Sequence, residues 1–395
     1  MEIKTNYPDV SVGVFVLMVN ALLLMSGRVD KIDLCNAKSL IIEAEVKMLI
    51  RASGIRPNIL ARRLFFLVIS MLNLCFARTV VGQDDVELGG YAVADLAWSP
   101  DGTQIAVGQG FALCSRVLDD PLYSIDILDA ASGEIRQTLS GPFCQTQSIS
   151  WSPDGTVIAT GSSDRGLWLW DVASGKVLSQ YQPTAFLGTD EIIWNPDGKW
   201  LVLHMGYRIE IYDPSSKTGI RLDPERLRGR ITAVSLSKEG DLLGMASESG
   251  YVYVINPMTD ETLSTFQVTL QDSIVLNMDW NADNSKFAVG DSKGNIYVMD
   301  GNTGETTLTL IGHSSSLEVL DWGENGLLVS GGYDGKIQIW QPETLALEPL
   351  LTIDNGLPVF AASWSPDGNY LAYGGLAESG QAAGIKVVSA PTPTP

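Results

Sequence analysis

From about residue 80 to the end of the chain, apolar and polar residues alternate in short runs separated by turn residues. A run with this period of two predicts a β-strand with one buried face, as in Ile149-Ser-Trp151. The Ser-Pro-Asp-Gly that follows predicts a tight turn, because Pro presets its φ, Asp bonds nearby backbone amides and Gly tolerates a positive φ. A second apolar strand comes next, as in Val157–Gly161. No segment in this part of the chain has convincing helical periodicity, so we expect an all-β fold.

This pattern repeats with a period of about 43 residues. The phrase Trp98-Ser-Pro-Asp-Gly102 returns in complete or altered form, and its first residue serves as an anchor. The anchors are residues 98, 151, 194, 236, 280, 322 and 364, spaced by 53, 43, 42, 44, 42 and 42 residues. Seven units, the first with an insertion, therefore account for nearly everything after residue 80.

Each unit predicts four short strands. A third strand follows the second, and a polar turn such as Ala173-Ser-Gly175 leads to a fourth strand such as Lys176–Gln180. The expected third strands are Trp168–Asp171, Ile209–Asp213, Val252–Asn256, Ile296–Asp300 and Ile337–Trp340.

These repeats resemble the WD40-repeat family over essentially all of residues 80 to 390, although Trp170-Asp171 is the one literal Trp-Asp pair that ends a third strand. The resemblance implies a seven-bladed β-propeller of four-stranded antiparallel blades, whose loops hold partner proteins or peptides. The repeated Trp-Ser-Pro-Asp-Gly phrase also resembles TolB-type periplasmic propellers, and this branch stays open.

The same resemblance implies a buried hydrogen-bond network that fixes the blade turn. In WD40 blades it joins a His before the first strand, a Ser or Thr in the second, an Asp in the next turn and a Trp in the third. Blade six has the complete set, and blade two has all but the His. The residues are His313, Ser330, Asp334 and Trp340 in blade six, and Thr160, Asp164 and Trp170 in blade two.

Blade seven lacks a fourth strand. Its predicted strands are Val359–Trp364, Tyr370–Gly374 and Ile385–Val388, after which the chain enters the Pro/Thr tail, residues 391–395. An unpaired edge of this kind is usually covered. We expect Val81–Val86 to pair with the third strand and close the ring.

The first 77 residues differ from the propeller, residues 78–390. Residues 48–77 have the layout of a signal peptide, with arginines before the apolar run Leu64–Phe76 and cleavage after Ala77 or Gly82. Residues 1–47 are then a non-globular extension from a start assigned too far upstream. The protein is expected to be exported. The alternative is a membrane anchor formed by the uncleaved N-terminal hydrophobic segment.

The net charge of −20 argues against nucleic acid as a partner. Nucleic-acid binding requires Lys and Arg to neutralise phosphates. Removing residues 1–77 leaves 17 basic and 40 acidic side chains, so the expected mature protein is more acidic still. We expect a monomeric propeller that binds no nucleic acid.

Little in the chain points to catalysis. His313 with Ser330 and Asp334 invites a hydrolase interpretation, but no G-x-S-x-G motif exists and these residues fit the blade network. His204 fits a packed position in a strand. The chain has two His and four Cys, which is little material for a metal site. Its Asp-rich pieces lack the spacing of a calcium loop, and nothing in the sequence favours a cofactor. No catalytic, metal-binding or cofactor-binding residue is predicted.

Two candidate sites remain. Arg221, Arg226, Arg228 and Arg230, between blades three and four, form a basic patch that could bind a carboxylate or phosphate, or a solvated loop with internal ion pairs. Export would leave Cys114 and Cys144 as an even pair and so a disulfide candidate, with two free thiols as the alternative.

We therefore expect an exported, non-catalytic module that presents loops to a protein or peptide partner. The alternative is a propeller enzyme, or a TolB-like envelope protein, with a site over the central channel.

Overall fold

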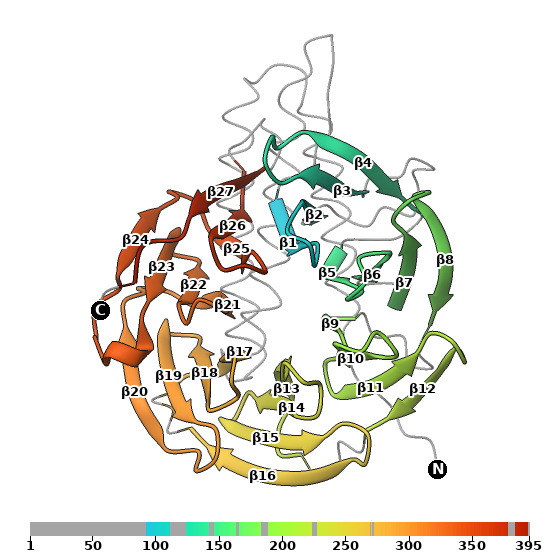
Figure 1. Ribbon diagram of the computed structural model, residues 1–395. Helices are drawn as coiled ribbons and strands as arrows, with labels where there is room; N and C mark the ends of the chain where they lie inside the picture. The colour runs from blue at the N-terminus through green and yellow to red at the C-terminus, as the bar shows by residue number, and fades with distance from the viewer. Residues whose placement is uncertain are drawn as a thin grey trace, which may run out of the picture. The chain divides into compact units, whose positions relative to one another are not determined.

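The computed structural model describes residues 92–110, 124–141, 146–162, 166–182, 189–222, 227–268, 270, 272–377 and 384–393. These residues form seven antiparallel sheets, six of four strands and one of three. Each sheet is one sequence repeat, and the sheets stand around a centre as the blades of a propeller (Figure 1). The prediction of an all-β, seven-bladed propeller is confirmed.

The strands follow the repeats along the chain. Blade one contains β1 (Ala92–Trp98), β2 (Gln104–Gly110), β3 (Ser124–Asp129) and β4 (Ile135–Ser140), and blade two β5 (Thr146–Trp151), β6 (Val157–Ser162), β7 (Gly166–Asp171) and β8 (Lys176–Tyr181). Blade three contains β9 (Glu191–Trp194), β10 (Leu201–Met205), β11 (Arg208–Asp213) and β12 (Thr218–Arg221), and blade four β13 (Ile231–Leu236), β14 (Leu243–Ser247), β15 (Tyr251–Asn256) and β16 (Glu261–Gln267). Blade five contains β17 (Val275–Trp280), β18 (Lys286–Asp291), β19 (Asn295–Asp300) and β20 (Thr306–Ile311), and blade six β21 (Leu317–Trp322), β22 (Leu328–Gly332), β23 (Lys336–Trp340) and β24 (Leu351–Asp354). Blade seven contains β25 (Val359–Trp364), β26 (Tyr370–Gly375) and β27 (Ile385–Ser389), and a short 3-10 helix, η2 (Pro342–Thr344), precedes β24.

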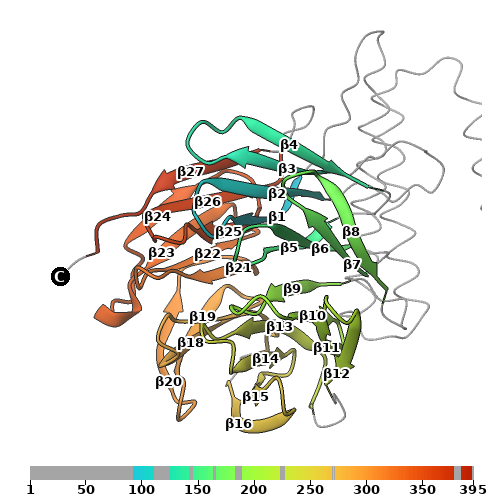
Figure 2. The ribbon, with the colours of Figure 1, turned by 45° about the vertical axis from the view of Figure 1, so that its right-hand side comes forward.

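Within each blade, the first strand is innermost and the last lies at the rim (Figures 1 and 2). Burial follows this order. Every residue of β10 is buried, whereas every residue of β12 in the same sheet is exposed. The second and third strands therefore read as apolar runs and the fourth strands as mostly polar ones, because the middle of each sheet is covered on both faces.

The Ser-Pro-Asp-Gly turn joins the first and second strands, as the sequence predicts. In blade one the Ser99 hydroxyl donates to Asp101 Oδ1 over 2.6 Å and accepts from the Gln104 amide over 2.9 Å. Gly102 sits at φ +69°, a conformation that side chains rarely adopt. The turn is thus held by its own residues, which explains why it recurs with so little change.

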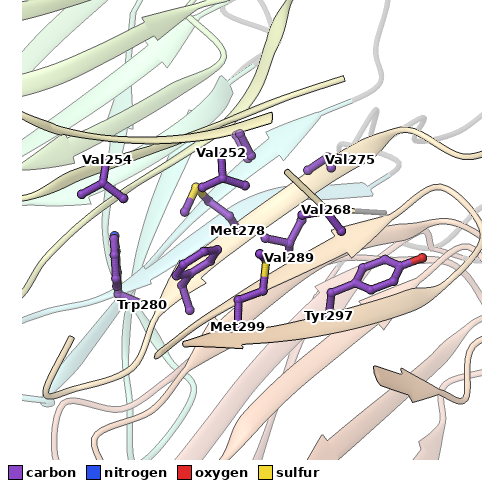
Figure 3. Packing of buried hydrophobic residues seen from close by; sticks show 12 residues of the cluster. Val252, Val254, Val268, Val275, Met278, Trp280, Val289, Tyr297 and Met299 are labelled. Atoms are coloured by element: carbon purple, nitrogen blue, oxygen red, sulfur yellow. The ribbon is translucent and has the colours of Figure 1, made fainter. Parts of the chain in front are cut away.

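The apolar core lies between neighbouring blades. Between blades four and five, Val252 and Val254 face Met278 and Trp280, and the Trp280 ring meets Phe287 edge-on at 5.2 Å between centroids (Figure 3). Six further clusters of buried residues line the remaining contacts around the ring. Since each blade buries both faces against its neighbours, the blades stabilise one another.

Blade one contacts blade seven directly. Ala92 forms an antiparallel bridge with Leu376, and the Trp98 indole donates to the Ser363 carbonyl over 3.0 Å. The three strands predicted for blade seven are present within a residue at each end. The expected closing strand Val81–Val86 lies outside the described residues.

Several further predictions also lie outside the described residues: the extension 1–47, the signal 48–77, Cys114, Cys144, Asp164 and Arg226. In the part of the chain that the structure describes, no helix has the length and hydropathy to cross a membrane.

Candidate functional site

The innermost strands carry a repeated β-bulge. In blade one the pairing register shifts between Val93 and Asp95, and Ala94 is the extra residue. A bulge re-aims the side chains next to it, here toward the centre of the ring. The extra residues are Ala94, Gln147, Thr232, Leu276, Glu318 and Phe360, and in blade three Asp190 holds the matching place four residues before the anchor Trp. All seven line the central cavity and are half-buried.

A cavity of about 650 Å³ occupies the centre of the ring and is lined by all seven innermost strands. We call it the central channel, and its mouth is the end that the seven bulge-position residues surround. The channel wall is acidic: Asp95, Asp190, Glu191, Glu318 and Asp321 line it, and no Lys or Arg does among the described residues. Such a wall concentrates a negative potential inside the channel.

Several carboxylates of the inner strands also join neighbouring blades. Asp95 accepts from the Ile149 amide over 2.6 Å, and Asp321 accepts from the Trp364 amide over 2.7 Å. Asp279 bridges both of its neighbours, because it accepts from Ser235 of blade four and from the Trp322 amide of blade six, each over 2.7 Å. These bonds hold the inner strands together and fix the shape of the channel.

Glu191 makes a similar but longer bond, from the Val234 amide over 3.2 Å. Burial raises the pKa of Glu191 to about 8, and nearby carboxylates, beginning with Asp95, add to the rise. Burial likewise raises the pKa of Asp95 to about 7. It also raises the pKa values of Asp279 and Asp321, and for Asp279 the charge of Asp321 contributes. Near neutral pH, part of the negative charge in the channel is therefore masked by protons.

His204 lies on β10, directly behind the channel mouth. It is 2% exposed, as expected for a packed strand position, and its Nε2 lies 3.2 Å from the carbonyl oxygens of both Gly206 and Ile231. Since carbonyls only accept, Nε2 carries the proton. Burial lowers the pKa of His204, so the ring stays neutral and Nδ1 is an acceptor. Nδ1 has no hydrogen-bond partner.

The described arginines of the predicted basic patch do not converge on one point. Arg221 is exposed on the outer strand β12. Arg228 donates to the Tyr251 hydroxyl over 3.0 Å, and its guanidinium lies 5.2 Å from the centroid of that ring. Arg230 lies 3.7 Å from Asp190 at the rim of the channel. Anion binding by this patch stays a prediction.

In blade six the structure joins the four residues of the predicted network. His313 lies 3.0 Å from Asp334 through Nδ1 and 2.8 Å from the Ser330 hydroxyl through Nε2. The Trp340 indole donates to the same hydroxyl over 2.9 Å. In blade two the Trp170 indole donates to the Thr160 hydroxyl over 3.0 Å.

The order of bonds in blade six, Asp to His to Ser, is also that of a hydrolytic triad. Ser330, however, is fully buried, and the indole of Trp340 already occupies its oxygen. A substrate has no access to this hydroxyl, so the arrangement is structural. Among the described residues, no three His, Cys, Asp or Glu side chains are grouped closely enough to hold a metal ion.

The sequence did not single out these inner-strand carboxylates. A signal was available, because the acids stand at fixed offsets from the anchor residue. Asp95 and Glu191 lie three residues before their anchors, while Asp279 and Asp321 lie one residue before. However, a strand with a period of two does not reveal the bulge. Without the bulge there is no reason to expect that carboxylates at these offsets point toward the centre of the ring.

Two family models match parts of this chain. A model described as "Anaphase-promoting complex subunit 4 WD40 domain" matches residues 234–325, and one described as "WD domain, G-beta repeat" matches residues 133–171.

Curated relatives match longer stretches at low identity. WD repeat-containing protein slp1 of Schizosaccharomyces pombe is 25% identical over 55% of this chain and 44% of its own length. WD repeat-containing protein 26 homolog of Arabidopsis thaliana is 23% identical over 63% and 40%. SIR4-interacting protein SIF2 of Saccharomyces cerevisiae is 22% identical over 70% and 43%. The chain thus spans less than half the length of these relatives.

Proposed function

We propose that this WD40-repeat propeller binds other proteins or peptides at its channel mouth and catalyses no reaction of its own. One observation carries the proposal: the mouth of an acidic channel lies on the same face as the exposed Tyr207 and the stacked pair Arg228 and Tyr251. The name of one relative, SIR4-interacting protein SIF2, describes that relative as interacting with another protein.

The side chains suited to binding lie on one face, which we call the mouth face. It carries the connections between blades and the turns between second and third strands. Tyr207, in such a turn, is 62% exposed, and Arg228 stacks on Tyr251. Tyr333 meets Phe360 edge-on at 5.4 Å. Tyrosine and arginine are the residue types that contribute most to protein interfaces.

The rigidity of this face supports binding without large rearrangement. The seven bulge-position residues stand on or next to the inner strands, and carboxylates of these strands bond the next blade, so few conformations of the mouth are lost when a partner docks.

The test is capture of partners from a native extract by the immobilised full chain, with chemical crosslinking. Tyr207→Ala should reduce recovery of a specific partner by about tenfold or more, as for an interface anchor. Tyr370→Ala is the matched control, because Tyr370 is 47% exposed and follows the Ser-Pro-Asp-Gly turn on the opposite face. Equal recovery by both variants would place binding elsewhere and remove the support for the mouth face.

We also propose that the protein is exported as a monomer and binds no nucleic acid, supported by the signal-like residues 48–77 and the net charge of −20. The alternative is an uncleaved N-terminal anchor. Mass spectrometry of the N-terminus of the mature protein distinguishes the two: a start just after Ala77 or Gly82 indicates export, and an intact N-terminus indicates the anchor.

A second candidate is a propeller enzyme or a TolB-like envelope protein with a site over the channel. It is favoured by Glu191, whose pKa of about 8 would keep a proton available near neutral pH. Reproducible turnover by the purified chain in a hydrolase and dehydrogenase screen, abolished by Glu191→Gln, would replace the binding proposal with this one.

A further inference from the structure

We propose that the channel mouth between blades two, three and four accepts a cationic side chain, the ammonium of a Lys or the guanidinium of an Arg, from the bound partner. This inference rests on the proposed function and specifies the chemistry of the partner. Three separate features of the mouth lead to it.

The first feature is charge. Asp190 directly precedes Glu191, the first residue of β9, and Asp95 of β1 lines the same channel. No Lys or Arg lines the channel among the residues that the structure describes. A cation entering this cavity would meet several carboxyl groups within a wall of protein, where attraction is stronger than at an open surface.

The second feature is a pair of acceptors without donors. His204 Nδ1 is buried and unpartnered, and the fixed position of the Nε2 proton makes it an acceptor. His204 pairs in register with Glu191, so it belongs to the same part of the mouth. Gln147 Oε1, from the neighbouring inner strand, also lacks a partner. A buried acceptor without a donor is costly, and the N–H groups of a cation would supply the missing donors.

The third feature is Arg230. Its guanidinium already lies 3.7 Å from Asp190 and is half-exposed, which shows that the rim accepts this type of group. Because Arg230 belongs to the protein itself, it competes with an incoming cation for Asp190. Removing it should therefore strengthen cation binding, whereas an anion-binding patch would lose affinity.

An organic cation fits better than a metal ion. The channel acids are distributed over blades one, three and six, and among the described residues no three ligating side chains converge on one point. A long side chain can reach the rim and extend several bonds into the cavity, while a metal ion requires its ligands within a single coordination sphere.

The experiment measures binding of short peptides to the full chain by calorimetry and NMR. The probes are acetyl-Gly-Arg-Gly-amide and acetyl-Gly-Lys-Gly-amide, with the norleucine peptide as the uncharged analogue and spermidine as a free polyamine. At least one cationic peptide should bind about tenfold or more tightly than the norleucine peptide. Equal binding of the norleucine peptide would overturn the inference. Binding of spermidine with no binding of either peptide would overturn it too, by assigning the site to free polyamines.

Variants then test the location. Glu191→Gln and Asp190→Asn keep an acceptor for their backbone amides and remove the charge. At pH 9, where the Glu191 carboxyl has lost its proton, each should weaken binding of the better peptide by about tenfold. Glu134→Gln, exposed in an outer turn, is the matched control and should leave binding unchanged. Arg230→Gln should tighten binding, and a loss of affinity in this variant would contradict the inference in favour of an anion site.

The pH dependence of peptide binding is a further test. Glu191 is surrounded by the carboxyls of Asp95, Asp279 and the adjacent Asp190. It also pairs in register with His204, and Arg230 acts on His204 and Asp190. Since Glu191 has a pKa of about 8 and must lose its proton to attract a cation, affinity should rise about tenfold between pH 7 and pH 9. A flat profile would remove Glu191 from the site.

The partner itself separates this inference from the proposed function. If wild type and Glu191→Gln capture the partner equally at pH 9, the cationic side chain is not used and the inference fails, while the binding function stands. If no partner is captured at all, the proposed function fails first.

Discussion

Glu191 should make the stability of the propeller fall as the pH rises. Its carboxyl group is half-buried in the channel wall, with one amide donor at 3.2 Å and the carboxyls of Asp95, Asp279 and Asp190 around it. Burial, with the neighbouring negative charges, raises its pKa from 4.5 to about 8. The replacement Glu191→Gln keeps the shape and the acceptor but removes the titration.

The direction follows from proton binding. Below pH 4.5 the carboxyl is protonated in the folded and the unfolded chain. Between that pH and about 8 the folded chain keeps a proton that the unfolded chain releases, so its contribution to stability is lost progressively as the pH rises. Each unit of pKa difference corresponds to about 1.4 kcal/mol, which sets an upper limit of about 5 kcal/mol. Water in the open channel reduces the effect, and we expect about 1–3 kcal/mol.

Urea unfolding at pH 5.5, 7.0 and 8.5, followed by tryptophan fluorescence, measures this contribution of Glu191 to the free energy of unfolding. Between pH 5.5 and 8.5 the wild type should lose about 1–3 kcal/mol more free energy of unfolding than Glu191→Gln. The exposed control Glu134→Gln should follow the wild type, since it reports the general effect of removing one negative charge. Parallel pH profiles for wild type and Glu191→Gln would refute the reasoning.

Three further changes test other parts of the structure. Ser330→Ala should lower the free energy of unfolding by about 2–4 kcal/mol in urea titrations, because it leaves the buried histidine and tryptophan of blade six without their shared partner; a loss below about 0.5 kcal/mol would show that the network contributes little. Deleting residues 78–88 should lower the melting temperature sharply if they supply the closing strand of blade seven, and an unchanged value would rule that strand out. Cys114 and Cys144 should resist alkylation without reductant in the exported protein, and an intact mass with both thiols alkylated would end the disulfide hypothesis.

The blade is the part of the structure that local sequence determines. The Ser-Pro-Asp-Gly turn at Ser99 is held by bonds among residues two to five positions apart, so the phrase predicts the hairpin without knowledge of the rest of the chain. Apolar and polar residues alternate along each strand with a period of two, which is also a local pattern. Because this pattern recurs in seven units, it predicted a ring of seven blades. The network of blade six is also local, because Ser330 and Trp340 are ten residues apart within one blade.

The channel is decided by tertiary structure. Whether Asp95 faces solvent, a neighbouring sheet or a cavity depends on the bulge at Ala94 and on Ile149, the bonding partner 54 residues further on. Neither is visible in the pattern around Asp95, because a bulge shifts the pairing by one residue and so changes the face to which a side chain points. The acceptor role of His204 likewise depends on the Ile231 carbonyl in the next blade. The sequence by itself determined the repeating blades, since their bonds are local; only the closed ring decided which polar residues meet at its centre, since those contacts join segments that are distant in the chain.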